Sequence, residues 1–174
     1  MAIKTIITEP NKILRQRSLP VNEVGKEEQR LMDDMLETMY NARGIGLAAI
    51  QIGVPKRIIV MDISKNDEKN NPMYFVNPLI KNKIQETSTY EEGCLSVPNI
   101  FAEVDRPKKC DVEYLDYNGE KKILNTEGLL STCIQHEMDH LEGILFIDYL
   151  SKLKKTMIIK KLSKQKDRPD RIIV

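Results

Sequence analysis

Tryptophan is absent from this 174-residue sequence, and aromatic residues make up only 5% of it. A hydrophobic core must therefore consist mainly of Ile, Leu, Val and Met side chains. The content of 41% hydrophobic and 30% charged residues excludes an intrinsically disordered chain and is typical of a soluble globular protein. The length fits one domain of ordinary size, which is large enough to bury such a core.

Long apolar runs are also missing, since no stretch of the sequence approaches the roughly 20 apolar residues of a membrane-spanning helix. The first ten residues have no basic start, no sustained apolar stretch and no small-residue cleavage site. They therefore do not look like a secretion signal. We expect a cytoplasmic protein that makes no contact with a membrane.

The sequence contains few cysteines and has no large excess of positive or negative charge. The three cysteines, Cys94, Cys110 and Cys133, are an odd number without a signal peptide, which indicates reduced thiols and not a disulfide framework. The net charge of +1 gives no general attraction to nucleic acid. Residues 152–171 are an exception, because they hold nine Lys or Arg and two Asp, a local excess of seven positive charges.

Hydrophobic periodicity predicts helices over 24–42, 128–141 and 150–165. The last of these is expected to carry Leu153, Met157, Ile158 and Leu162 on one apolar face. Thr126 is a possible N-cap for the second helix. Alternating or β-branched stretches predict strands over 56–63, 73–76, 79–85, 101–105, 110–116 and 122–124. Asn118-Gly119 is a hairpin turn signal, and residues 44–53 are too rich in glycine for a stable helix. Several short strands with two or three helices favour an α+β fold with antiparallel sheets.

The clearest chemical motif is His136-Glu137-Met138-Asp139-His140, which contains both histidines of the chain. Residues four apart on a helix share a face, so the two imidazoles can reach one metal ion. Glu137 lies beside the first histidine and can act as general base toward a water on that ion. The alternative is two surface histidines on an exposed helix. The apolar neighbours favour a buried helix instead, namely Leu129, Leu130, Ile134 and Leu141.

A catalytic metal site of this kind needs a third protein ligand. A common metalloprotease pattern places a third histidine where this chain has Phe146, and no glutamate follows Glu142. Asp148 is the one downstream alternative, although nothing in its context favours it.

A cysteine thiolate is the natural upstream candidate for the third ligand. Cys133 lies seven residues before His140, about 10 Å along a helix, which is too far for both to join His136 on one ion. Cys110 lies in an alternating strand, where packing is its expected role. Cys94 lies in a segment predicted to be irregular, the glycine-containing residues 91–96, which can present a side chain to a neighbouring helix. Spacing therefore favours Cys94 over the other two cysteines.

Three segments in this order resemble the signature motifs of the peptide deformylase family, in its bacterial and organellar form. Residues 44–51 read GIGLAAIQ, residues 92–96 read EGCLS and residues 135–140 read QHEMDH. The resemblance covers nearly the whole chain. It implies a hydrolase that removes the formyl group from the N-terminal methionine of nascent polypeptides. It also implies one divalent metal ion, natively Fe²⁺, with Zn²⁺, Ni²⁺ or Co²⁺ able to substitute.

The resemblance also implies a role for individual residues. Cys94, His136 and His140 would be the metal ligands, and Glu137 would be the general acid and base. Gln51 and the backbone N–H of Leu95 would polarise the formyl oxygen. The implied substrate-binding residues are Gly46, Leu47, Tyr90, Glu92, Gly93, Leu129, Thr132 and Cys133. Within that set, the methionine pocket would comprise Tyr90, Leu129, Thr132 and Cys133.

Two positions depart from the family pattern. Thr132 stands where an aliphatic residue is common, and Phe101 stands where some members have arginine. Any ionic contact that the arginine makes is therefore not expected here.

Antiparallel sheets are thus expected around a central metal-binding helix, with a C-terminal helix after them. Residues 1–150 would form the catalytic domain, and residues 151–174 a basic helix and tail of the same domain. The basic segment has two interpretations, a solvated face or a surface that contacts ribosomal RNA.

Two other functions compete with deformylation. A zinc peptidase would share the His-Glu-x-x-His chemistry but requires a downstream ligand. A metal-stabilised RNA-binding module would use the basic segment and would have no need of Glu137.

Overall fold

The computed structural model describes residues 2–64 and 70–166 of the chain. Three α-helices are α1 (Lys26–Asn41), α2 (Leu129–Leu141) and α3 (Lys152–Lys166). The strands are β1 (Gly46–Ala48), β2 (Ile58–Met61), β3 (Met73–Lys83), β4 (Thr87–Cys94), β5 (Val97–Pro107), β6 (Lys109–Leu115) and β7 (Lys121–Glu127). Short 3₁₀ helices are η1 (Lys12–Arg15), η2 (Ala49–Ile52) and η3 (Phe146–Tyr149).

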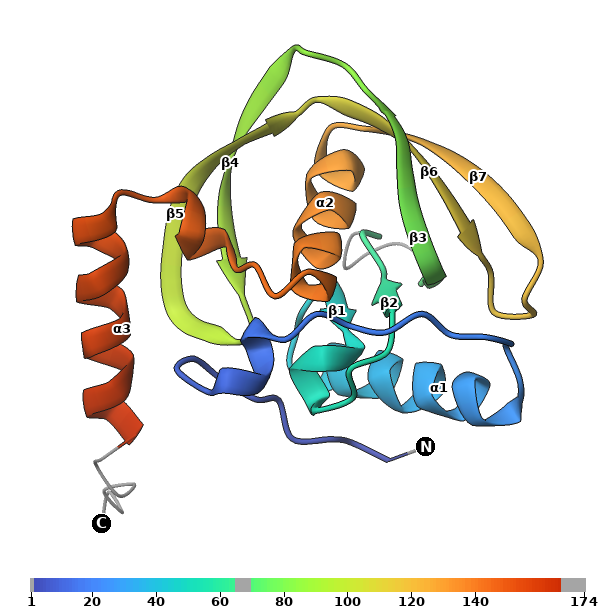
Figure 1. Ribbon diagram of the computed structural model, residues 1–174, viewed down its shortest axis with the longest axis horizontal. Helices are drawn as coiled ribbons and strands as arrows, with labels where there is room; N and C mark the ends of the chain where they lie inside the picture. The colour runs from blue at the N-terminus through green and yellow to red at the C-terminus, as the bar shows by residue number, and fades with distance from the viewer. Residues whose placement is uncertain (1, 65–69, 167–174) are drawn as a thin grey trace.

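Two antiparallel sheets surround α2, which occupies the centre of the molecule (Figure 1). The larger sheet has the order β1-β2-β3-β6-β7, and β4 pairs with β5 in the smaller one. Ile134 and Leu141 of α2 pack with Ile59 and Phe75 of the larger sheet in one apolar cluster. The predicted α+β fold with antiparallel sheets around this helix is confirmed.

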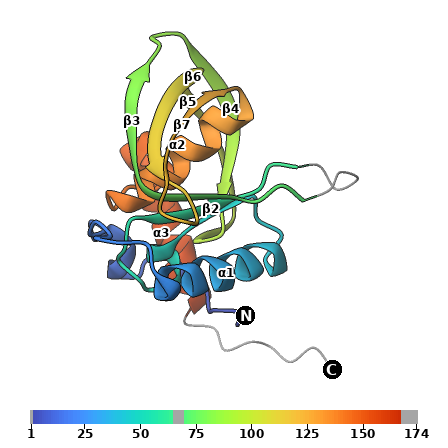
Figure 2. The same cartoon turned by 90° about the vertical axis from the view of Figure 1, so that its right-hand side faces the viewer.

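The first helix supplies a second core on the other side of the larger sheet. Met32, Met35 and Met39 of α1 are fully buried and pack against Leu47 and Val60. Figure 2 shows α1 along the base of the molecule, below β2. Flexible methionine side chains thus fill the space that larger aromatic residues occupy in many cores.

Two local predictions were wrong. The strands predicted over 73–76 and 79–85 form one strand, β3, which ends at Lys83, because a register shift between Val76 and Leu79 absorbs the Asn77-Pro78 interruption. Asn77 takes a positive φ of 51°, and its side chain bonds both the N–H and the carbonyl of Val21. Thr126 does not cap α2, since it lies in β7 and donates its hydroxyl to the Cys110 carbonyl.

Two strands near the site were not predicted. The segment before Cys94 is not irregular, because Thr87–Cys94 forms β4 and pairs with β5 along its length. Gly46–Ala48 forms β1 at the edge of the larger sheet. The expectation that the glycine-rich segment is not an α-helix holds, since a 3₁₀ turn follows β1.

The C-terminal helix stands at the side of the molecule, next to β5 (Figure 1). The prediction of one apolar face that includes Leu153 and Met157 was wrong, because these side chains are 72% and 62% exposed. Leu162 instead packs with Val104 and Phe146, and Lys155 pairs with Asp148 at 2.5 Å. Residues 167–174 of the basic segment lie outside the described residues. In the part of the chain that is described, no helix is both long and apolar enough to span a bilayer.

Two leucines of α3 provide a matched test of how this helix is held. We expect Leu162→Ala to lower the free energy of unfolding by about 2–3 kcal/mol, because truncating a buried leucine removes apolar contact and leaves a cavity. Leu153→Ala makes the same substitution on the solvent side and should change stability by less than about 0.5 kcal/mol. Denaturant unfolding measures both. Equal effects of the two substitutions would contradict the packing of α3.

Candidate active site

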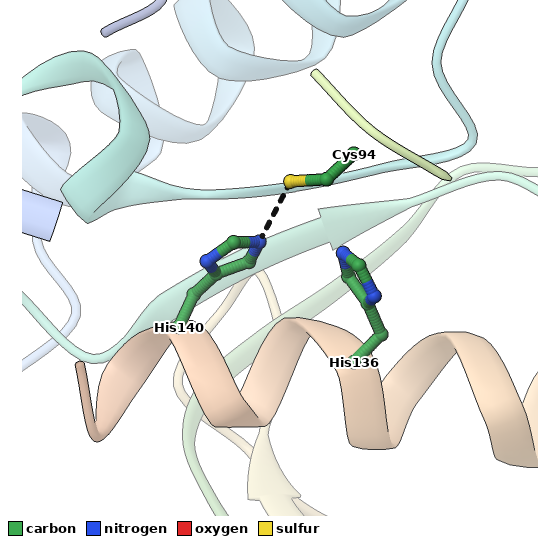
Figure 3. Close-up of side chains that lie close together, drawn as sticks. All are labelled: Cys94, His136 and His140. Carbon is green, nitrogen blue, oxygen red and sulfur yellow. Dashed lines mark hydrogen bonds between the residues drawn. The ribbon is translucent and has the colours of Figure 1, made fainter. Parts of the chain in front are cut away.

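Three side chains with metal-ligating atoms converge between β4 and α2. Cys94 ends β4, whereas His136 and His140 lie one turn apart on α2. Their ligand atoms all lie within 4.8 Å of one another, and Cys94 Sγ is 3.3 Å from His140 Nε2. Figure 3 shows both imidazoles pointing up from the helix, with the cysteine sulfur above them.

This donor set fits a divalent transition metal ion. Bonds of 2.0–2.3 Å to a tetrahedral ion hold two donors roughly 3.3–3.8 Å apart, so the three side chains need to move little. A thiolate with two imidazoles suits ions such as Zn²⁺ and Fe²⁺ better than Mg²⁺ or Ca²⁺. The structure therefore contains a Cys-His-His group able to hold such an ion.

Glu92 orients the first histidine. Its Oε2 accepts a hydrogen bond from His136 Nδ1 at 2.8 Å, which leaves Nε2 of the ring free to bind an ion. Burial opposes ionisation of Glu92, but the hydrogen bonds from His136 and Arg106 lower its pKa overall. The family resemblance implied that Glu92 binds the substrate. Its carboxylate instead bonds the Nδ1 side of the His136 ring.

Arg106 in turn forms a buried ion pair with Glu92, which was not predicted from the sequence. Its Nε and Nη2 donate to the two carboxylate oxygens at 2.5 and 3.0 Å, and both side chains are buried. Nη1 donates to Asp139, which also accepts from the Tyr149 hydroxyl. The one available signal was an arginine at an inward position of an alternating strand, which needs a buried partner.

The two histidines differ in their affinity for a proton. Burial and the positive charge of His136 lower the pKa of His140 well below its usual value, so this imidazole is neutral. Burial also disfavours a charge on His136, but Cys94 and Glu92 raise its pKa well above the usual value. The surroundings of the two imidazoles therefore favour the protonated form of His136 and the neutral form of His140.

Glu137 lies buried beside the two histidines. Burial raises its pKa to about 7, and within the described residues its Oε2 finds no hydrogen-bond partner. A Cβ at Gly46 would collide with its carboxylate. Gly46 has no positive φ within β1, so close approach is the reason for glycine at this position.

Gln51 presents its amide toward Cys94 in one fixed orientation. Its Oε1 accepts from the Ala48 N–H at 2.8 Å, and its Nε2 donates to Ser96 Oγ at 3.0 Å. Nε2 also lies 3.6 Å from Cys94 Sγ. Ser96 is fully buried and was not singled out from the sequence, although it belongs to the second motif.

A cavity of about 540 Å³ opens onto these groups. The expected substrate-binding residues that line it are Gly46, Tyr90, Glu92, Gly93, Leu129, Thr132 and Cys133. Phe101, 66% exposed, lies at the same cavity. Leu47 does not line it, because its side chain is buried against α1. Only the backbone of Leu47 could meet a ligand here.

The other ligand candidates are not part of the Cys-His-His group. Asp148 bonds Arg15 and the N–H of Leu145, and Cys110 contacts Thr126 Oγ1. Cys133 lines the cavity but lies one turn before His136 on α2.

Comparison with known proteins agrees with this geometry. The family model described as polypeptide deformylase matches residues 3–156. The peptide deformylase of Pelagibacter ubique (strain HTCC1062) is 73% identical over 174 residues, covering 100% of both chains. That of Rhizobium meliloti (strain 1021) is 54% identical over 94% of each chain.

Solved structures give the same result. The crystal structure of peptide deformylase from Ehrlichia chaffeensis in complex with actinonin superposes with a TM-score of 0.92 and 42% identity, covering 97% of this chain and 100% of that one. The chain therefore belongs to the peptide deformylase family, metal-dependent hydrolases that remove the N-formyl group from nascent polypeptides.

Proposed function

We propose that this chain hydrolyses N-formylmethionyl peptides with Cys94, His136 and His140 as the metal ligands and Glu137 as the proton carrier. The observation that carries the proposal is the convergence of the three ligand atoms next to a buried carboxylate with an unpaired oxygen. The peptidase alternative lacks support, because the candidate third ligand is upstream and every named comparison is a deformylase.

Fe²⁺ is the native ion in this proposal, and Zn²⁺, Ni²⁺ or Co²⁺ could take its place. Such an ion would supply Lewis acidity and lower the pKa of a water molecule to about 7. A thiolate ligand beside iron also makes the site sensitive to oxidation, since thiolates are the species that oxidants attack.

Glu137 takes a proton from the attacking water and later gives it to the departing amine. A carboxyl group whose pKa is about 7 is suited to both steps near neutral pH, because its two forms are similarly populated. The lack of a protein partner for Oε2 among the described residues supports this role. The carboxylate has no competing hydrogen bond to break there.

Gln51 and the backbone N–H of Leu95 stabilise the negative charge that develops on the formyl oxygen. The amide of Gln51 is held by Ala48 and Ser96, so it needs little reorganisation as the charge forms. Among the described strands, β1 is at the edge of the larger sheet, which supports the binding of the peptide backbone as an added strand beside Gly46 and Leu47. The methionine side chain would then enter the pocket between Tyr90, Leu129, Thr132 and Cys133.

We expect Glu137→Gln to reduce formate release by about 10²–10⁴-fold while the protein keeps its metal, since an amide cannot carry the proton. Glu103→Gln is the matched control, because Glu103 is an exposed residue of β5. Formate assay and metal analysis of the same preparations provide the measurement. Unchanged formate release by Glu137→Gln would contradict the role of Glu137 as the proton carrier.

The basic C-terminal segment is proposed to contact ribosomal RNA, which would place the enzyme in the cytoplasm near emerging chains. The supporting observation is that α3 exposes lysines on a helix with no acidic residue. Lys155 is less available, because it pairs with Asp148.

Replacing five exposed α3 lysines with glutamine should weaken co-sedimentation with ribosomes, and added salt should weaken binding of the unaltered protein. The set is Lys152, Lys154, Lys160, Lys161 and Lys164. The control replaces five exposed lysines of the larger sheet, namely Lys81, Lys83, Lys109, Lys121 and Lys122. Salt-insensitive binding that both sets leave intact would contradict the contact.

A further inference from the structure

The proposed methionine pocket contains a hydroxyl group that the reaction does not use. Thr132 lines the cavity and is only 4% exposed. Its backbone N–H bonds the Gly128 carbonyl at 3.0 Å, but its Oγ1 finds no hydrogen-bond partner among the described residues. A buried hydroxyl without a partner costs free energy, so a role in packing alone does not account for it.

Neighbouring hydroxyl groups are satisfied by the protein itself. Ser131, the preceding residue of α2, donates to the Pro107 carbonyl at 3.1 Å, and Thr126 donates to the Cys110 carbonyl at 2.8 Å. Neither residue lines the cavity, and each bonds a backbone carbonyl of a strand. Ser18 and Ser88 also have hydroxyls without a partner among the described residues, but of these three residues only Thr132 lines the cavity.

The side chain can turn its hydroxyl toward a ligand. A threonine on a helix populates two χ1 wells, and rotation between them exchanges the hydroxyl and the methyl group at the wall. The adjacent Cys133 also lines the cavity, and burial raises the pKa of its thiol well above the usual value. The wall thus offers a neutral O–H donor and a weak S–H donor, and Leu129 adds an apolar surface.

We propose that Thr132 donates a hydrogen bond to the polar group of the substrate's first side chain, so that the site hydrolyses formyl-methionine sulfoxide peptides as well as formyl-methionine peptides. This inference rests on the proposed deformylase function. A thioether sulfur is a weak acceptor, whereas a sulfoxide oxygen is a strong one. In a wholly apolar pocket that oxygen would lose its hydration without gaining a donor. The sulfoxide itself is unchanged in the reaction.

The test compares three formylated peptides that differ only in the first side chain. In each peptide the first residue is followed by Ala-Ser. Methionine presents a weak hydrogen-bond acceptor, methionine sulfoxide a strong one, and norleucine none. Formate release gives kcat/KM for each, and the two sulfoxide epimers are assayed separately. Thr132→Val removes the hydroxyl at nearly constant volume, and Thr132→Ser keeps it. The norleucine peptide serves as the reference within each variant, so a general loss of activity cancels.

For the unaltered protein we expect measurable hydrolysis of at least one sulfoxide epimer. Thr132→Val should lower the sulfoxide-to-norleucine ratio about tenfold and the methionine-to-norleucine ratio about twofold, as expected for losing one neutral hydrogen bond. Thr132→Ser should keep both ratios within about twofold of the original. Ratios that do not change in Thr132→Val, or no hydrolysis of either epimer, would overturn the inference. Failure to release formate from any of the peptides would overturn the proposed function itself.

Discussion

The buried carboxylate of Glu92 is the contact on which the rest of the site depends. It joins β4 to β5 through Arg106 and joins both strands to α2 through His136. Removing one partner of a buried ion pair typically costs 3–5 kcal/mol, because the other charge is left uncompensated. The same contact fixes the imidazole ring so that Nε2 can bind an ion. A single ionic cluster therefore stabilises the packing of the smaller sheet and aligns the histidine proposed as a metal ligand.

The site is assembled where the two sheets approach one helix from different sides. The edge strand β1 brings Gly46 against Glu137, and its lack of a side chain gives the carboxylate room. The 3₁₀ turn after β1 carries Gln51, whose amide is bound by Ser96 just beyond β4. Each of the three sequence motifs thus supplies one wall of a common site. Because these walls belong to separate elements, the chemistry requires the whole domain to be folded.

The sequence predicted elements well where the signal was local. Helix periodicity identified α1 and α2, and the two histidines four residues apart identified the face of α2 that holds them. Residues 87–94 escaped prediction because their stabilisation comes from pairing with β5, a contact distant in sequence. Arg106, Ser96 and Asp139 were missed for the same reason, since their partners lie on other elements. Leu153 shows the opposite error, because helical spacing does not tell which apolar positions the protein covers.

The central claim is that hydrolysis depends on an ion held by Cys94 together with His136 and His140. The most direct measurement is formate release from formyl-Met-Ala-Ser by anaerobically purified protein, with the metal content of each preparation determined. We expect a chelator to abolish the activity. Cys94→Ala should lose both the metal and the activity, whereas Cys110→Ala should retain both. Fully metallated protein that releases no formate but cleaves unformylated peptides would contradict the claim.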